Sequence, residues 1–134
     1  MSNFKMTHRF IVKELSFLNK GKVGETFQIQ PLFSRKIDKL SDNEYEVAIK
    51  VELKDTIENP FPFDLTATVA LITKIEGQIT ENELNDYLNN RCISILFPYL
   101  RASVTSVTSA ALMTPLVLPI IDASTFVIDN KLVK

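Results

Sequence analysis

The stretch TENELNDYLNNRCISILFPYLRASVTSVTSAAL, residues 80–112, decides the fold. It begins with a pattern that fits a capping box, in which the Thr80 oxygen accepts the N–H of residue 83 and the Glu83 carboxylate reaches back. Apolar residues then recur at helical spacing in two stripes: Leu84, Leu88, Cys92 and Ile95, and then Ile93, Leu96, Phe97, Leu100, Val104, Val107 and Ala111. The stretch therefore predicts one long helix with a continuous apolar face.

A proline and a run of small residues divide this helix. Pro98 lacks an N–H and its ring clashes with the preceding turn, so a kink or a split is expected there. Small residues follow, among them Ser103, Ser106 and Ala110. Another backbone can come close to such a face. Two interpretations are open: close packing on the chain's own sheet, or a contact between subunits.

Four segments before the helix have the alternation of strands. They are residues 6–18, 25–33, 45–53 and 63–75. The first changes phase partway along, which indicates a bulge, and Pro31 indicates an edge or a bulge in the second. Strands followed by one helix predict an α+β fold: a four-stranded antiparallel sheet packed on one long, Pro-kinked helix. After the helix, residues 116–121 are apolar, and Pro115 and Pro119 predict an extended arm.

Length and composition restrict the class of protein. The chain has 134 residues, which predicts a single domain over residues 1–134, and its 46% hydrophobic content argues against disorder. With 15 basic and 16 acidic residues, no nucleic-acid partner is expected. Residues 110–121 are too short and proline-rich for a membrane span, so no membrane insertion is expected. The first nine residues lack a secretory pattern, which predicts a cytoplasmic protein.

Groups for catalysis are sparse. The chain has one histidine, His8, and one cysteine, Cys92, and no phosphate-binding glycine motif. Glu44, Glu46 and Glu52 alternate with lysines, which favours a solvated strand face over an acid/base pair. We therefore expect no enzyme activity, no cofactor and no metal.

Three separated motifs resemble the family of the bacterial protein-export chaperone SecB. Residues 95–99, ILFPY, followed by Arg101 and by Val104-Thr105-Ser106, resemble its long helix, whose motif is close to ILFPYAR…ITS. Residues 115–122, PLVLPIID, resemble its apolar, proline-bearing segment, and residues 13–17, KELSF, resemble its first strand. The matches occur in the family's order and cover most of the chain.

The resemblance implies an ATP-independent holdase that keeps secretory precursors unfolded and passes them to the translocation motor SecA. It also implies a homotetramer, a dimer of dimers, whose first strands pair across subunits and whose helices lie between two sheets. Cys92, Ser103, Ser106 and Ala110 would then line the oligomer interface, and Glu14 would contact the motor. The expected client-binding residues are Val23, Leu32, Leu116, Val117, Leu118, Ile120 and Ile121.

The client groove also follows from the strand pattern. If Phe27 and Ile29 face the helix, Leu32 and part of the arm lack a partner within the chain, and a groove would shield them. Burial of the arm in the core is the alternative, under which substitution of Leu118 and Ile120 would cost stability instead of client affinity.

Two departures from the family pattern keep other functions open. Two of the family's acidic motor-docking positions fall at Leu18 and Thr66, which carry no charge, and the family's final helix is shorter here. A SecB-like chaperone dedicated to one partner, such as an antitoxin, is one alternative. A carrier of a small apolar ligand between helix and sheet is another.

Overall fold

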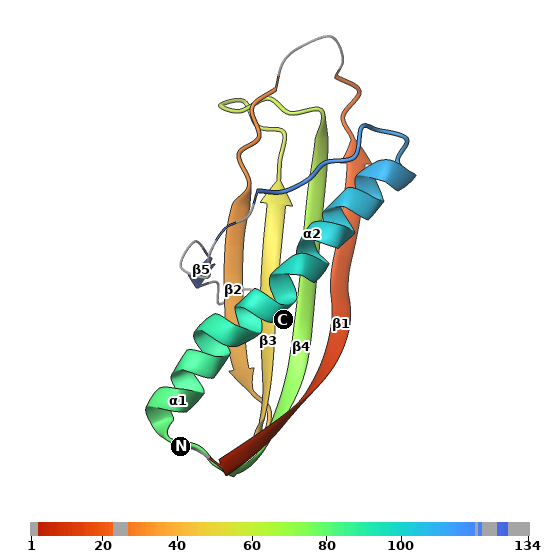
Figure 1. Cartoon of the computed structure of the whole chain (residues 1–134). Coiled ribbons are helices and arrows are strands. Elements are labelled where there is room, and N and C mark those ends of the chain that lie inside the picture. The colour runs from red at the N-terminus through yellow and green to blue at the C-terminus, as the bar shows by residue number, and fades with distance from the viewer. Residues whose placement is uncertain (1–2, 23–26, 120, 122–125, 129–134) are drawn as a thin grey trace.

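The computed structural model describes residues 3–22, 27–119, 121 and 126–128. The elements, in chain order, are β1 (Asn3–Asn19), β2 (Leu32–Lys39), β3 (Glu44–Leu53), β4 (Phe63–Gln78), α1 (Glu81–Asp86), the π-helical turn η1 (Tyr87–Arg91), α2 (Cys92–Ala110) and β5 (Val127–Ile128). The sheet order is β1-β4-β3-β2-β5, and only β5 runs parallel to its neighbour. Figure 1 shows the helix crossing one face obliquely, from the β2 side to the β1 side. The predicted α+β fold is confirmed, with β5 as an added short strand.

Three of the four predicted strands lie where the alternation placed them. In β1 the register shifts between Val12 and Glu14, which confirms the predicted bulge. The prediction for the second strand is wrong, because it was placed at residues 25–33 whereas β2 spans Leu32–Lys39. Arg35 interrupts the apolar alternation of β2, because it stands between Phe33 and Ile37 on the face toward the helix. Its guanidinium donates to the backbone oxygen and to Oδ1 of Asn89, at 3.1 and 3.0 Å.

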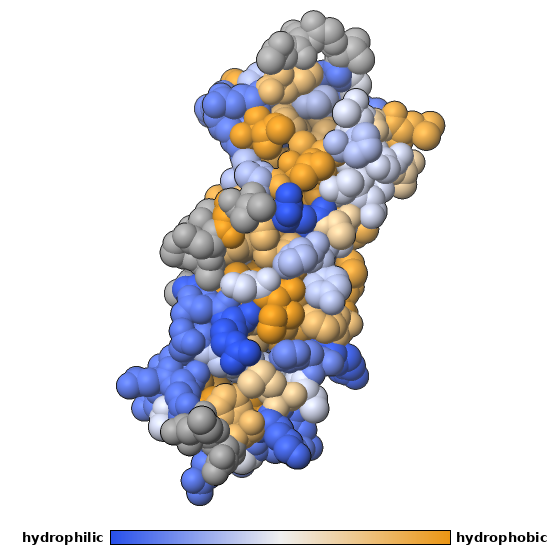
Figure 2. Space-filling model, in the orientation of Figure 1, coloured by the Kyte–Doolittle hydropathy of each residue, from blue (hydrophilic) through white to orange (hydrophobic). Residues whose placement is uncertain are grey.

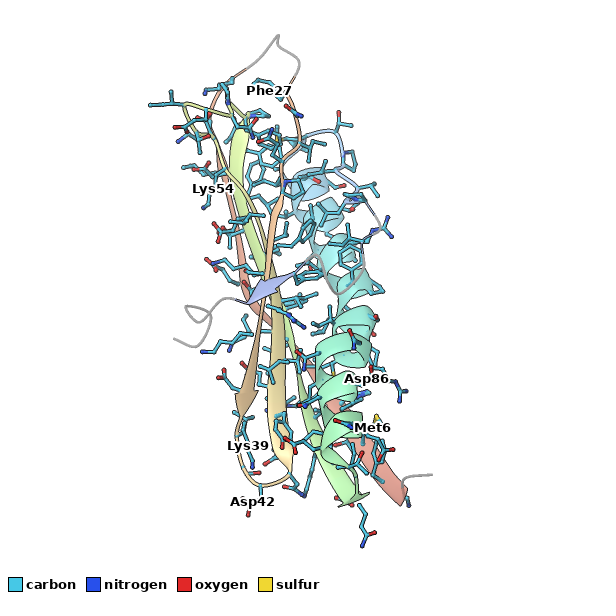
Figure 3. All side chains as sticks on the ribbon, turned by 90° about the vertical axis from the view of Figure 1, so that its left-hand side faces the viewer. Met6, Phe27, Lys39, Asp42, Lys54 and Asp86 are labelled. Atoms are coloured by element: carbon cyan, nitrogen blue, oxygen red, sulfur yellow. The ribbon has the colours of Figure 1, made fainter. Side chains whose placement is uncertain are left out.

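The core lies between the sheet and the helix. Figure 3 shows these two layers from the side, with Lys39, Asp42, Met6 and Asp86 toward one end and Phe27 toward the other. Side chains with no more than 1% exposure come from both layers: Val47, Ile49, Val51 and Leu53 of β3, Leu65 and Leu71 of β4, and Ile93, Leu96, Leu100 and Val104 of α2. The opposite face of the sheet, called the outer face below, carries the charged residues of the same strands.

The helix begins at the predicted capping box. Thr80 Oγ1 accepts from the Glu83 N–H at 3.2 Å, and a Glu83 carboxylate oxygen accepts from the Thr80 N–H at 3.0 Å. Of the two outcomes predicted at Pro98, a kink or a split, the split is not seen, because α2 continues unbroken through this residue. Pro98 and Ser94 are both exposed, so water can hydrogen-bond the carbonyl that the proline leaves without a donor. No helix in the described part of the chain is long and apolar enough to cross a membrane.

Candidate functional site

An apolar strip runs along the sheet edge on the helix-bearing face. We define it as Phe10, Val12 and Leu15 of β1 together with Tyr99 of α2, whose exposed fractions are 42%, 57%, 44% and 50%. The Phe10 and Tyr99 rings lie 4.7 Å apart. β1 ends the sheet order, so the described residues leave one side of its backbone without a neighbouring strand. An exposed apolar edge strand is a surface that natural proteins cover with a partner.

The small residues of α2 lie beside this strip. Ser106 and Ala110 are exposed and Ser103 is half-buried, whereas Val104 and Thr108 face the sheet. Packing on the chain's own sheet therefore does not explain Ser106 and Ala110. Figure 2 shows pale and apolar surface together on this side of the molecule. The helix thus presents a surface of small side chains, and the backbone of a second helix can come close to it.

Cys92 begins α2, seven residues before Tyr99, so its helical spacing places it on the same stripe as the small residues. Its side chain has no exposed surface, so a contact between Cys92 and a second subunit is not compatible with this structure. Burial raises the pKa of the thiol to about 11, which outweighs the opposite effects of a hydrogen bond with Tyr87 and of the Arg91 charge. The thiol is therefore neutral at physiological pH and unsuited to nucleophilic chemistry.

Tyr87 joins the helix to two strands. Its hydroxyl lies 2.6 Å from His8 Nε2 on β1 and 2.8 Å from Thr73 Oγ1 on β4. Burial is the main reason that the Tyr87 pKa is raised. The phenol therefore stays protonated, and its single proton serves one neighbour while the other neighbour donates to its oxygen. The cluster holds β1 against the helix and contains no activated nucleophile.

We expect Tyr87→Phe to lower the unfolding free energy by about 1–3 kcal/mol, because the fully buried Thr73 hydroxyl loses a partner. Urea denaturation followed by circular dichroism measures the change. Tyr99→Phe removes a hydroxyl from a half-exposed side chain and is the control, with an expected change within about 0.5 kcal/mol. Equal stability of the two variants would contradict a structural role for the Tyr87 hydroxyl.

The proline-bearing arm folds back along α2 and is held by polar side chains of the helix. Arg101 Nε donates to the Leu118 carbonyl at 3.0 Å, and Thr105 Oγ1 donates to the Leu116 carbonyl at 2.7 Å. Thr108 Oγ1 accepts from the Leu116 N–H at 2.9 Å. The sequence prediction did not identify these anchoring roles. Their spacing of four and then three residues places Arg101, Thr105 and Thr108 on one helical face, which is a signal the sequence contains.

The predicted client-binding residues are distributed over different surfaces. Leu118 is 1% exposed and belongs to the core, whereas Val117 is 62% exposed; Leu116 and Ile121 are half-buried. Leu32 is 61% exposed on the outer face, because its neighbour Phe33 faces the core. The arm lies on the helix side, so Leu32 and the arm do not form one groove within the protomer. Val23 and Ile120 lie outside the described residues.

The outer face carries charges of both signs, and several of its carboxylates are paired with lysines. The ion pairs are Lys13–Glu46 at 2.6 Å, Lys50–Glu52 at 2.9 Å, Lys36–Asp38 at 3.5 Å and Lys20–Asp64 at 3.8 Å. The predicted motor-docking residue Glu14 is exposed on this face, Leu18 is 58% exposed and Thr66 is 5% exposed. Glu14 therefore stands without the neighbouring acidic residues that the family resemblance implies.

The structure is a sheet with one helical layer, and its edge strand and arm carry exposed apolar side chains that are suited to contacts with other polypeptides. Among the residues that the structure describes, no group of three or more histidine, cysteine or carboxylate residues is placed to hold a metal ion.

The family model for SecB, the preprotein translocase subunit, matches residues 2–130, and the chain belongs to this family. Two relatives, each named protein-export protein SecB, come from Orientia tsutsugamushi strains Boryong and Ikeda. Both are 30% identical over 127 residues, which is 90% of this chain and 79% or 77% of the relative. Members of the family are chaperones without enzymatic activity, so the prediction that this chain is not an enzyme is confirmed.

A solved structure shares the fold. It is a SecB-like chaperone from Mycobacterium tuberculosis in complex with a ChAD peptide from an antitoxin. Its TM-score is 0.70 at 19% identity, over 87% of this chain and 91% of that one. The family resemblance found in the sequence is therefore confirmed by the family model and by the relatives, and the fold by this neighbour.

Proposed function

We propose that this chain is an ATP-independent holdase of the cytoplasm that binds unfolded secretory precursors for export. The observation that carries this proposal is the exposure of large apolar side chains in a SecB-family protomer, with Leu32 and Val117 each more than 60% exposed. Burial of a leucine or valine side chain of a client contributes about 1.5–3 kcal/mol. Several such separate sites bind an unfolded chain together without a fixed client sequence.

Assembly forms the second part of the proposal. The exposed strip on β1 and the small residues of α2 are suited to contacts between copies of this chain, in a homotetramer of the kind that the family resemblance implies. The strip then serves subunit contacts, and clients bind at Leu32, Val117 and the exposed residues around them. Ser103, Ser106 and Ala110 stay in the proposed interface, and Cys92 is omitted because it is buried within the protomer.

The charge of the outer face affects whether SecA or a single dedicated partner is the better candidate. The paired carboxylates of this face give little net negative charge, so Glu14 is the residue we propose for a contact with SecA, and that contact would be weak. The same feature favours a second function, that of a chaperone dedicated to one partner. The Mycobacterium tuberculosis neighbour was solved with an antitoxin peptide, which makes an antitoxin a reasonable partner to test.

An aggregation assay without nucleotide tests the holdase. We expect the protein to delay light scattering by a chemically unfolded secretory precursor after dilution, and the addition of ATP to change nothing. Leu32→Ser with Val117→Ser should shorten the delay because two exposed apolar contacts are lost. Ile57→Ser is the control for an exposed apolar residue elsewhere, since Ile57 is 96% exposed in the loop between β3 and β4.

Two outcomes would remove the holdase proposal: a requirement for ATP, or equal binding of the native and the unfolded client. For the dedicated function, the delay would be confined to one client when several unfolded proteins are compared. The alternative of a carrier for a small apolar ligand between helix and sheet is not favoured, because the buried apolar side chains of the two layers pack into one cluster.

A further inference from the structure

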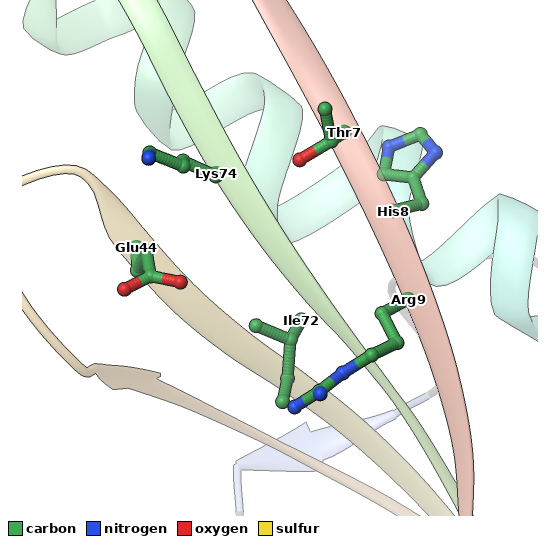
Figure 4. A pocket seen from close by; sticks show the side chains of 6 residues that line it. All are labelled: Thr7, His8, Arg9, Glu44, Ile72 and Lys74. Atoms are coloured by element: carbon green, nitrogen blue, oxygen red, sulfur yellow. The ribbon is translucent and has the colours of Figure 1, made fainter.

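A pocket of about 530 Å³ opens near the end of the sheet where β3 begins. It is lined by Thr7, His8, Arg9, Glu44, Ile72 and Lys74. Thr7, Lys74 and Glu44 stand on one rung across β1, β4 and β3, and Arg9 and Ile72 stand on the rung beside it. Figure 4 shows the Arg9 side chain reaching across to Ile72, with Lys74 and Glu44 facing the same space. This pocket is separate from the apolar strip and from the arm.

The charges in this pocket are not paired as several others on the outer face are. Arg9 has no carboxylate within 4 Å among the described residues. Lys74 is 3.8 Å from Glu76, and both side chains are about half exposed, so this pair is weak. Glu44 already accepts a hydrogen bond from Ser41 at 3.3 Å. Two cations therefore face one carboxylate, whereas the neighbouring Lys13 and Glu46 pair at 2.6 Å.

We propose that this pocket binds a glutamate or aspartate side chain of an acidic polypeptide segment. The Arg9 guanidinium can hold a carboxylate through two parallel N–H donors, and Lys74 adds a second charge on the same side. The Thr7 hydroxyl offers a further donor. Ile72 supplies an apolar wall for the methylene groups of the bound side chain.

The surroundings favour a protein over a nucleic acid. A nucleic acid carries closely spaced phosphates that need a stripe of cations. Beyond the pocket the outer-face lysines Lys13 and Lys50 are paired with Glu46 and Glu52, and the whole chain has a net charge of −1. A face whose lysines are already paired attracts a polyanion only weakly, whereas a peptide that carries single carboxylates between neutral residues needs only the pocket.

Fluorescence anisotropy with a labelled peptide of alternating Glu and Ser tests this proposal at low ionic strength. We expect saturable binding that weakens as salt is raised. Arg9→Gln with Lys74→Gln should weaken it by roughly tenfold or more, the loss that accompanies removal of a charged hydrogen bond. Lys39→Gln with Lys54→Gln removes the same charge from two other exposed lysines and should leave affinity within about twofold.

Three results would overturn the proposal. They are equal binding of a peptide of alternating Lys and Ser, an equal loss of affinity in the control variant, and binding of a single-stranded oligonucleotide with the same dependence on Arg9 and Lys74. The holdase assay distinguishes this proposal from the proposed function. The Arg9 and Lys74 variant should delay aggregation of an apolar client as well as the unchanged protein does.

Discussion

Leu118→Ala should lower the unfolding free energy of the protein by about 2–5 kcal/mol, the usual loss for a leucine truncated in a packed core. Leu118 is 1% exposed and packs with the buried residues of the helix and sheet. Its carbonyl also accepts from Arg101 Nε, so the backbone cannot easily shift to fill the space. Guanidinium denaturation at a fixed protomer concentration measures the loss.

Val117→Ala is the matched control for this experiment. Val117 is the next residue in the same arm but is 62% exposed, so its truncation should change stability by no more than about 0.5 kcal/mol. The pair separates two roles within one segment: Leu118 fastens the arm to the core, and Val117 is available to a client. Equal stability of the two variants would mean that the arm does not pack on the helix.

The helix and the third and fourth strands were predictable because their signals are local. A capping box uses the side chains of Thr80 and Glu83, three residues apart, and no distant contact is needed to form it. β3 alternates apolar and charged residues, with Ala48 as the one interruption on its charged face, so its buried face can be read directly. Most of the architecture follows from these two patterns.

The second strand and the arm were harder to predict, because distant contacts decide them. Arg35 breaks the alternation of β2, and only the fold shows that its Nη1 donates to Asn89 on the helix. In the arm, Leu116, Val117 and Leu118 were all predicted to bind clients. The structure alternates them, with Val117 outward and Leu118 inward. This difference depends on where Arg101 and Thr105 hold the backbone.

The role of Cys92 was misjudged for a related reason. Helical spacing places Cys92 on the same stripe of α2 as Ser103, Ser106 and Ala110, yet the Cys92 side chain has no exposed surface. The helix crosses the sheet obliquely (Figure 1), so one stripe is covered at the Cys92 end and exposed near the β1 edge. Periodicity identifies the stripe, but only the crossing angle decides which part of it is buried.

Val12→Asp should convert the proposed oligomer into a smaller species. Val12 is 57% exposed in the protomer and lies in the middle of the strip. In a symmetric contact between two β1 strands the substitution occurs twice. Each copy loses about 1.5–3 kcal/mol of apolar burial and also places a carboxylate against apolar groups. The subunit dissociation constant should rise by about 100-fold or more.

Ser16→Asp supplies the control for Val12→Asp, because it adds the same charge to an exposed residue of β1 on the outer face. Light scattering coupled to gel filtration distinguishes the outcomes, given a protomer mass of 15.2 kDa. The unchanged protein and Ser16→Asp should elute as one oligomer, while Val12→Asp should elute at a lower mass with its circular dichroism spectrum retained. A 15.2 kDa monomer in the unchanged protein would show that the strip does not join subunits, and the strip would then have to be tested as client-binding surface.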